Sequence, residues 1–417
     1  MNNPVAVIGG GAAGCLAAAF AAEAGSPVVL IEKNSRIGRK VLISGKGRCN
    51  VTNAQYTVQD LLDHIPVNGR FLYSAFSNFM PQDTMDLMES LGVPLKLERG
   101  NRVFPVSDRA MDIVDALDRN LKHHHVKQMT DRATGLVVED GRVTGVRTEQ
   151  HGTIACRAAV LCTGGLSYPR TGSTGDGYRM AQELGHTITR LTPSLVPLVA
   201  DDPCCKDMQG LSLKNVTLRL LDTASGKCLY EELGEMLFTH FGVSGPLVLS
   251  ASSMVRDMQP GRYHLVIDWK PGLSEEQLDA RLLRDFEKNA NKDFQNSLGA
   301  LLPATAIPVF VAKSGIPGDK KVHQITKQER QALLDCFKRF TLPVADFRPV
   351  EEAIVTSGGV STKEINPKTM ESKLVSGLYF AGELIDVDGY TGGFNLQIAF
   401  STGSLAGHYA GGTNDYV

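Results

Sequence analysis

The sequence predicts an α/β protein in which a domain built on a parallel sheet is interrupted by a smaller inserted domain. Three observations support this prediction: a strand, glycine-rich turn and helix at the N-terminus, a change of composition after about residue 190, and a second apolar strand with a glycine-rich turn near the C-terminus. We expect residues 1–190 and 350–417 to form the split domain and residues 191–349 to form the insertion.

The N-terminal segment alternates strand and helix. Residues 5–8 are apolar and predict a short buried strand, and the turn that follows, 9–14, reads Gly-Gly-Gly-Ala-Ala-Gly. An alanine-rich helix then runs to about residue 24, and the apolar residues 28–32 predict a second strand of a buried parallel sheet. Strand, turn, helix and strand make one βαβ unit.

Beyond this unit the first part of the split domain is mainly helical. Three candidate helices lie at 60–64, 83–91 and 111–121. The Asp140-Gly141 pair between two apolar runs then predicts a hairpin, and the apolar residues 158–161 predict a further strand.

The inserted domain has two parts. Residues 191–272 are rich in proline and short strand-like runs, so we expect them to be mostly β. Residues 273–349 carry helix signals, including Ser274 in a position to cap a helix N-terminus, so we expect this part to be helical.

The first turn has the spacing of a dinucleotide-binding, Rossmann-type fingerprint. Gly9 permits the tight turn, Gly11 lets a pyrophosphate approach the backbone, and Gly14 lets the helix pack on the strand. Phosphates held there face the positive end of the helix dipole. Glu32 follows about 20 residues later, where a carboxylate binds ribose hydroxyls and disfavours a 2′-phosphate. The alternative is a glycine-rich turn that binds no nucleotide.

The segment after Glu32 favours FAD over NAD. An NAD-binding domain normally continues into a third strand, whereas here a basic, glycine-rich loop occupies residues 36–50. Such a loop suits a second stretch of phosphate and ribitol. Arg39, Lys40 and Arg48 can instead form a solvated basic face.

The C-terminal block predicts the flavin end of the same site. Residues 378–381 form a strand that ends in Gly382 and Glu383, and Asp386 lies near enough to bind ribitol hydroxyls. The turn 392–395 then opens a final helix, whose amino end can face the flavin N1–O2 edge and stabilise negative charge there. The alternative is a glycine-rich loop before a packing helix.

Five blocks of the chain then identify a family. They read GRKVLISGKGRCNVTN at 38–53, FTHFGVSGP at 238–246, VTSGGV at 355–360, TMESK at 369–373, and AGELIDVDG with GGFNLQ at 381–389 and 392–397. In this order they resemble the BaiN and aminoacetone-oxidase-like family of FAD-dependent flavoproteins, almost from end to end. The resemblance implies a noncovalent FAD, a Rossmann-type domain split around an insertion, and a redox role.

The glycine motifs and the family resemblance together predict one set of cofactor-binding residues. The loop 44–50 and the glycines after the strand 158–161 enter it through the resemblance, as does Val126, whose backbone is expected to meet the adenine. The complete set is Gly9, Gly11, Ala13, Gly14, Glu32, Lys33, Arg39, Lys40, Ser44, Gly45, Gly47, Arg48, Cys49, Asn50, Val126, Gly164, Gly165, Gly382, Glu383, Asp386, Gly393, Phe394, Asn395 and Leu396.

The sequence is compatible with more than one reaction. The resemblance implies an FAD-dependent oxidoreductase for a small organic substrate, either an NAD(P)H-dependent reductase of an enone-like compound or an amine oxidase that uses dioxygen. The alternative from another class is a flavin-containing binding or redox-sensor protein with little turnover. His240 is the best candidate for proton transfer in the inserted domain, because the pKa of a histidine is ordinarily near neutral, although a histidine between two phenylalanines is more often a packed residue.

Composition narrows the class of partner. The formal net charge is −2 and 21% of residues are charged, which implies no general attraction to nucleic acid or to an anionic membrane. The eight cysteines show no C-x-x-C pair or zinc spacing, so we expect reduced thiols, no metal site and a cytoplasmic location. A small-molecule substrate, with NAD(P)H as a transient co-substrate, is the expected partner, and the oligomeric state is open.

Overall fold

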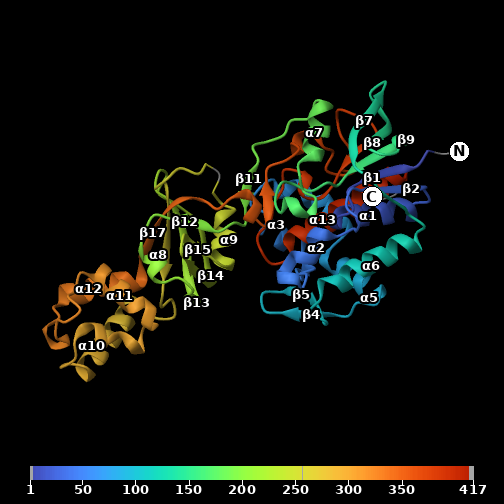
Figure 1. Cartoon of the computed structure of the whole chain (residues 1–417). Coiled ribbons are helices and arrows are strands. Elements are labelled where there is room, and N and C mark those ends of the chain that lie inside the picture. The colour runs from blue at the N-terminus through green and yellow to red at the C-terminus, as the bar shows by residue number, and fades with distance from the viewer. Residues whose placement is uncertain (1–2, 256, 413–417) are drawn as a thin grey trace. The chain divides into compact units, whose positions relative to one another are not determined.

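The computed structural model describes residues 3–255 and 257–412, and the chain divides into two compact units (Figure 1). Unit 1 comprises Met1–Ser194 and Val350–Val417, and unit 2 comprises Leu195–Pro349. The predicted α/β class, with a Rossmann-type domain that is split in sequence, is confirmed.

Unit 1 is built on a five-stranded parallel sheet. Its strands, in spatial order, are β19 (Leu378–Phe380), β10 (Ala158–Leu161), β1 (Val5–Ile8), β2 (Val28–Glu32) and β6 (Lys127–Thr130). Every pair is parallel. β1 is central and all its residues are buried, which explains why it is a continuous apolar run and does not alternate with polar residues. The C-terminal segment thus returns to the sheet beside β10.

Two helices of small residues cover the sheet. α1 (Ala12–Glu23) packs along α13 (Phe394–Gly411), and the two lie together beside β1 in Figure 1. A Cβ on Gly403 or Gly407 would come 2.3 or 2.2 Å from a backbone oxygen of α1. The alanine-rich and glycine-rich compositions of these helices therefore permit a backbone-to-backbone contact that larger side chains would prevent.

Most of the remaining helices of unit 1 lie between β2 and β6 in the sequence. They are α2 (Arg39–Ile43), α3 (Val58–Leu62), α4 (Tyr73–Asn78), α5 (Pro81–Ser90) and α6 (Ala110–His123), with α7 (Asp176–Glu183) after β10. The three helices predicted in this region correspond to α3, α5 and α6. Among helices in the described ranges, none has both the length and the apolar character needed to cross a bilayer.

Three small antiparallel sheets complete unit 1. One has the order β3 (Thr52–Asn53), β5 (Arg102–Pro105), β4 (Leu95–Glu98), and another has the order β7 (Ala133–Glu139), β8 (Arg142–Thr148), β9 (Gly152–Ala155). The third pairs β11 (Thr192–Ser194) with β18 (Val355–Ser357). The hairpin predicted at Asp140-Gly141 is confirmed as the β7–β8 turn.

Unit 2 is a six-stranded closed barrel with helices. The barrel order is β12 (Leu198–Ala200), β15 (Gly242–Ser244), β14 (Lys227–Thr239), β13 (Ser212–Asp222), β16 (Tyr263–Asp268) and β17 (Phe340–Phe347). The helices are α8 (Cys204–Asp207), α9 (Pro246–Ser252), α10 (Glu275–Lys288), α11 (Ile307–Ser314) and α12 (Lys327–Lys338). The ring of Trp269 packs against Phe310 and Phe340 in the core.

One part of the insertion differs from its prediction. The sequence predicts a helical part that extends to residue 349, but 340–347 form β17, which pairs with β16 and β12 to close the barrel. Its side chains alternate between buried and partly exposed from Phe340 to Val344, the pattern of a strand with one face in a core.

Candidate cofactor site

A pocket in unit 1 lies where the strands of the parallel sheet end. It is lined by residues that follow β1, β2, β6, β10 and β19, together with α2 and the start of α13. Ligands of open α/β sheets bind at the carboxyl ends of the strands. The pocket therefore joins the N-terminal fingerprint to the C-terminal block, which lies more than 300 residues further along the chain.

The three fingerprint glycines have different roles. Gly9 has a φ of +100°, and a Cβ on it would lie 2.6 Å from the carbonyl oxygen of Cys162. A Cβ on Gly14 would lie 1.8 Å from the carbonyl oxygen of Gly9, so both positions require glycine for packing. Gly11 caps α1, and a Cβ there would meet no atom of the described residues within 4 Å. That open space, beside the free N–H groups of α1, is where a pyrophosphate fits.

Glu32, predicted to bind the ribose, is held in place by backbone and side-chain donors of nearby turns. Its carboxylate accepts hydrogen bonds from the backbone N–H of Gly10 at 2.6 Å, and from the backbone and side-chain nitrogens of Asn34 at 2.8 and 2.6 Å. These donors orient the group, and the carboxylate has further lone pairs for ribose hydroxyls.

We expect Glu32→Ala to weaken FAD binding by about 1–3 kcal/mol, because it leaves the Gly10 N–H and the ribose hydroxyls without an acceptor. This corresponds to a rise in Kd of roughly 5- to 150-fold, measured by titrating apoprotein with FAD. Glu32→Gln keeps one oxygen acceptor and should lose less. An unchanged Kd for the alanine variant would show that the adenosine binds elsewhere.

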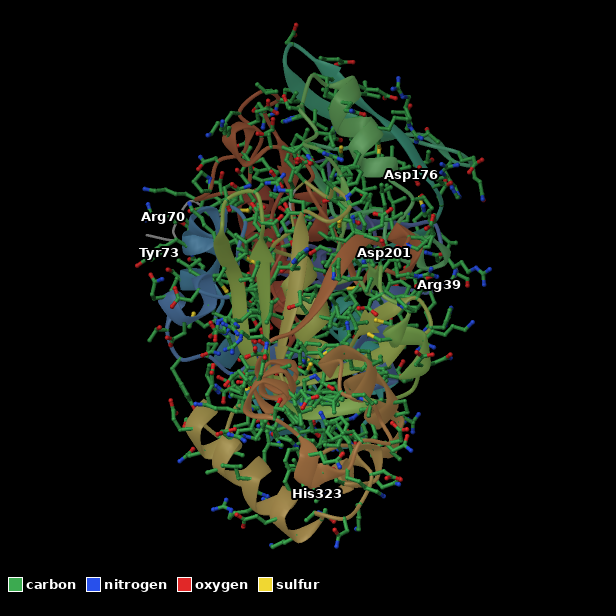
Figure 2. The ribbon with its side chains drawn as sticks, turned by 90° about the vertical axis from the view of Figure 1, so that its left-hand side faces the viewer. Arg39, Arg70, Tyr73, Asp176, Asp201 and His323 are labelled. Carbon is green, nitrogen blue, oxygen red and sulfur yellow. The ribbon has the colours of Figure 1, made fainter. Side chains whose placement is uncertain are left out.

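Asp176 is a pocket residue that the sequence analysis missed. It is the first residue of α7 (Figure 2), and its buried carboxylate accepts from Lys33 Nζ at 2.8 Å and from Arg132 at 2.7 Å. Burial opposes its ionisation, but the hydrogen bonds from Arg132 and Lys33 outweigh burial and hold the pKa of this carboxyl well below its usual range. Lys33, predicted beside the cofactor, is thus paired with an anion of unit 1.

A second polar cluster joins both halves of unit 1 at the pocket. Glu383 accepts from Lys40 Nζ at 2.6 Å, from Ser167 Oγ at 2.9 Å and from the Thr356 N–H at 2.8 Å. The adjacent Gly382 has a φ of +73°, and a Cβ on it would lie 2.9 Å from Ala13 Cβ. The predicted residues Lys40, Gly382 and Glu383 therefore meet as one wall of the pocket.

The start of α13 forms the wall expected at the flavin end. Gly393, its N-cap residue, has a φ of +105°, and a Cβ there would lie 2.4 Å from the Thr52 backbone. The Asn395 side chain accepts from the Gly389 N–H at 2.9 Å and donates to the carbonyls of Gly389 and Tyr390. These bonds fix the loop before the helix, so that the amino end of an 18-residue helix meets the pocket.

The hydroxyl of Thr163, after β10, does not face the open part of the pocket. Thr163 Oγ1 is buried, and a Cβ on Gly177 of α7 would lie 2.1 Å from it. The fit of the residues present to a dinucleotide rests instead on the open space at Gly11, beside the free N–H groups at the start of α1.

The structure brings many of the predicted residues together, but not all. The predicted residues that line the pocket are Gly9, Gly11, Ala13, Glu32, Lys33, Arg39, Lys40, Ser44, Gly164, Gly382, Glu383, Asn395 and Leu396. Behind this lining or beside it lie Gly14, Gly45, Gly47, Cys49, Asn50, Gly165, Gly393 and Phe394. Figure 2 shows Arg39 at the surface of unit 1, and its guanidinium donates to Asn34 Oδ1.

Arg48 is one of the predicted residues that lie outside the pocket lining. It forms ion pairs with Glu98 and Asp108 and stacks on the ring of Phe104, since both carboxylates face it from the β4–β5 sheet and the loop after it. The thiol of Cys49 is buried, which raises its pKa to about 12 and makes it unreactive.

Three further predicted residues also lie outside the pocket lining. Val126 directly precedes β6 and so lies at the amino end of that strand. Ligands meet the carboxyl end of a strand, and the pocket is accordingly lined by residues 131–133, which follow β6. Asp386 accepts from the side chain of Asn68. His240 is exposed in unit 2 beside the ring of Phe241.

Comparison with known proteins gives a family match over most of the chain. The model of the HI0933-like protein Rossmann domain family matches residues 3–409. The chain is 33% identical to the ribosomal RNA dihydrouridine synthase of Escherichia coli, over 95% of each protein. It is 32% identical to the Haemophilus influenzae protein of the same name, again over 95% of each, and 31% identical to the 3-dehydro-bile acid delta(4,6)-reductase of Clostridium scindens, over 98% of this chain and 99% of the relative.

Solved structures agree on the fold. The 3-ketosteroid delta1-dehydrogenase of Sterolibacterium denitrificans aligns with a TM-score of 0.53 at 13% identity, covering 98% of this chain and 99% of the other. At this identity the likeness shows a shared fold and no shared substrate.

Proposed function

The chain belongs to the HI0933-like family and is an FAD-dependent oxidoreductase, and on that premise we propose that it reduces a carbon–carbon double bond conjugated with a carbonyl group. The observation that carries the proposal is a chemistry shared by relatives that match over nearly their full length. Making dihydrouridine saturates the uracil C5–C6 bond, which is conjugated with the C4 carbonyl. A delta(4,6)-reductase of a 3-oxo compound saturates bonds conjugated with a ketone.

The walls of the pocket supply what this chemistry requires of the protein. Reduced FAD bound there would supply the hydride that saturation of such a bond requires, and the accompanying proton would come from solvent. The amino end of α13 places a positive pole at the flavin end, and Asn395 keeps that end in position. Lys40 and Glu383 form an ion pair in the same pocket, which holds the Lys40 ammonium group in a fixed position. NAD(P)H is the proposed source of the hydride.

We place a uridine of ribosomal RNA ahead of a steroid-like compound as the substrate. Two of the full-length relatives, from different bacteria, carry the RNA name and one carries the bile-acid name. This choice departs from the small-molecule partner expected from the near-neutral charge. A macromolecular substrate requires a local basic surface and not a high net charge of the whole chain.

Anaerobic spectroscopy of the purified holoenzyme tests the proposed class of reaction. We expect NADH or NADPH to bleach the flavin, and an enone or uridine-containing RNA to restore its absorbance in the absence of oxygen. If amines bleach the flavin and dioxygen is the one acceptor that restores it, the protein is an oxidase. If neither pyridine nucleotide nor amine bleaches it, the binding or sensor function is favoured instead.

A further inference from the structure

We propose that a surface strip of unit 1, formed by Lys46, Tyr56, Arg99 and Arg102, docks the single-stranded RNA that surrounds the target uridine. This inference rests on the proposed function and adds to it the surface that recognises the substrate. The strip combines two exposed cations, Lys46 and Arg99, and the partly exposed Arg102 with the exposed ring of Tyr56. That combination is typical of proteins that track a single strand through phosphate contacts and base stacking.

The four residues are linked through neighbouring backbone and side-chain contacts. A Cβ on Gly45 would lie 3.3 Å from the ring of Phe104, so the loop that carries Lys46 packs on that ring. The Arg102 guanidinium lies over the same ring, 5.9 Å from its centroid, and its Nε donates to the Arg99 carbonyl. The buried ring of Phe104 thus supports the cationic part of the strip.

Tyr56 joins the strip at the other end of β3. The N–H of Ala54 donates to the Asn101 carbonyl at 2.8 Å, which brings the chain just before Tyr56 beside the β4–β5 turn. Arg99 and Asn101 belong to that turn, at the end of the β4–β5 hairpin labelled in Figure 1. Tyr56 follows β3, Arg99 lies in the β4–β5 turn and Arg102 begins β5, so the three residues lie at one end of one small sheet.

The charge of the strip is partly uncompensated. Lys46 and Arg99 are exposed, and neither has an ion pair or side-chain hydrogen bond within residues 3–255 and 257–412. Their neighbour Arg48, by contrast, is paired with Glu98 and Asp108. Uncompensated cations beside neutralised ones leave a local positive surface on a chain whose net charge is −2.

Tyr56 supplies the aromatic element. Its side chain is 83% exposed, the largest value among the exposed large hydrophobic residues of the described chain. A tyrosine this exposed gains little stability from burial, whereas a base stacked on its ring would cover it. Stacking tolerates different sequences and requires an unpaired base, so it favours a single strand over a duplex.

The strip also adjoins the lining of the cofactor pocket. Ser44, two residues before Lys46, lines the pocket, and the loop between them is the 3-10 turn Ser44–Gly47. On the other side, Asn53 of β3 donates to the Gly392 carbonyl at 3.0 Å, directly before the N-cap of α13. RNA held on the strip would therefore lie beside the flavin end of the pocket.

Binding of a short, fluorescently labelled, uridine-containing single-stranded RNA to the FAD-loaded protein tests this proposal. We expect Tyr56→Ala to raise the Kd about tenfold, and Tyr56→Phe to bind like the unmodified protein, because phenylalanine retains the stacking face. Arg99→Glu should also weaken binding, and should flatten the dependence of log Kd on log salt by roughly 0.7 for the lost phosphate contact.

Lys127→Glu is the matched control for charge. Lys127 is exposed at the amino end of β6, whereas the pocket lies at the carboxyl ends of the strands. The same change of net charge should therefore leave RNA binding unchanged. Equal FAD absorbance in all variants shows that the cofactor site is intact.

The outcomes separate this inference from the proposed function. If Tyr56→Ala and Arg99→Glu bind RNA as tightly as the unmodified protein, or if a duplex or anionic lipid vesicles bind better than the single strand, the docking surface is wrong, even where the enzyme reduces a free enone. If the variants lose RNA affinity but no RNA uridine is ever reduced, the surface stands and the proposed reaction fails.

Discussion

Replacing Gly11 with aspartate should leave the apoprotein folded and remove its capacity to hold FAD. Gly11 has extended backbone angles that any residue adopts, and a Cβ there would meet no described atom within 4 Å. Aspartate is also a favourable N-cap for α1. In the holoprotein, however, its carboxylate would face the pyrophosphate, and two like charges at about 4 Å repel by about 4 kcal/mol near a protein surface.

The expected loss of FAD affinity is at least roughly 100-fold, measured by titration of apoprotein, with no fall in the denaturation midpoint of the apoprotein. Gly11→Asn is the matched control, because it has nearly the same volume and capping ability without the charge. It should lose less affinity than the aspartate variant. A yellow Gly11→Asp protein with a normal FAD content would contradict the position of the pyrophosphate.

Gln397→Leu should destabilise the FAD-binding unit by about 3–5 kcal/mol, because it leaves several buried polar groups unpaired. Gln397 is fully buried in α13. Its Oε1 accepts from the hydroxyls of Thr52 and Thr84 at 2.6 and 2.8 Å, and its Nε2 donates to the Phe79 carbonyl and to Ser401 Oγ. The side chain thus ties α13, whose amino end lines the pocket, to β3 and α5.

Urea denaturation, followed by release of flavin fluorescence, reports the loss of this unit. Ser404→Ala is the control on the same helix, since among the described residues the Ser404 hydroxyl bonds to the Ser401 carbonyl of α13 alone, and its removal should cost little. If Gln397→Leu unfolds at the same urea concentration as the unmodified protein, the buried network does not hold α13 in place.

The sequence predicted those parts of the site that local chemistry dictates. Gly9, Gly14 and Glu32 follow from a turn whose steric demands are visible in a short window of residues, and the structure shows the close contacts that demand glycine. The C-terminal wall was predictable for a different reason, because the block from Gly382 to Asn395 matches a family motif. Parallel strands then bring both segments to one edge of the sheet.

The residues that were missed depend on long-range contacts. Asp176 and Arg132 are polar residues in unremarkable sequence contexts, and they reach the pocket through α7 and the chain after β6. The one available signal was an aspartate at the first position of a helix after a glycine-rich loop. The position of Arg48 outside the pocket lining has the converse reason: its partners Glu98 and Asp108 lie 50 or more residues away, and no local pattern reveals that they pair with it.

The same limit applies to β17. Its residues follow a well-capped helix, α12, and were therefore grouped with the helical part of the insertion. Only its pairing with β16 and β12, which lie far away in sequence, identifies it as the strand that closes the barrel.

Formation of dihydrouridine in unmodified ribosomal RNA is the most direct measurement of the central claim. Holoenzyme, NADPH or NADH, and ribosomal RNA transcribed in vitro would be incubated without oxygen, and the RNA then digested and its nucleosides analysed by mass spectrometry. The account predicts dihydrouridine in an amount that matches the pyridine nucleotide consumed, and none with the Gly11→Asp protein. Flavin that is reduced by the nucleotide and reoxidised by a steroid-like enone, with no dihydrouridine formed in RNA, would contradict it.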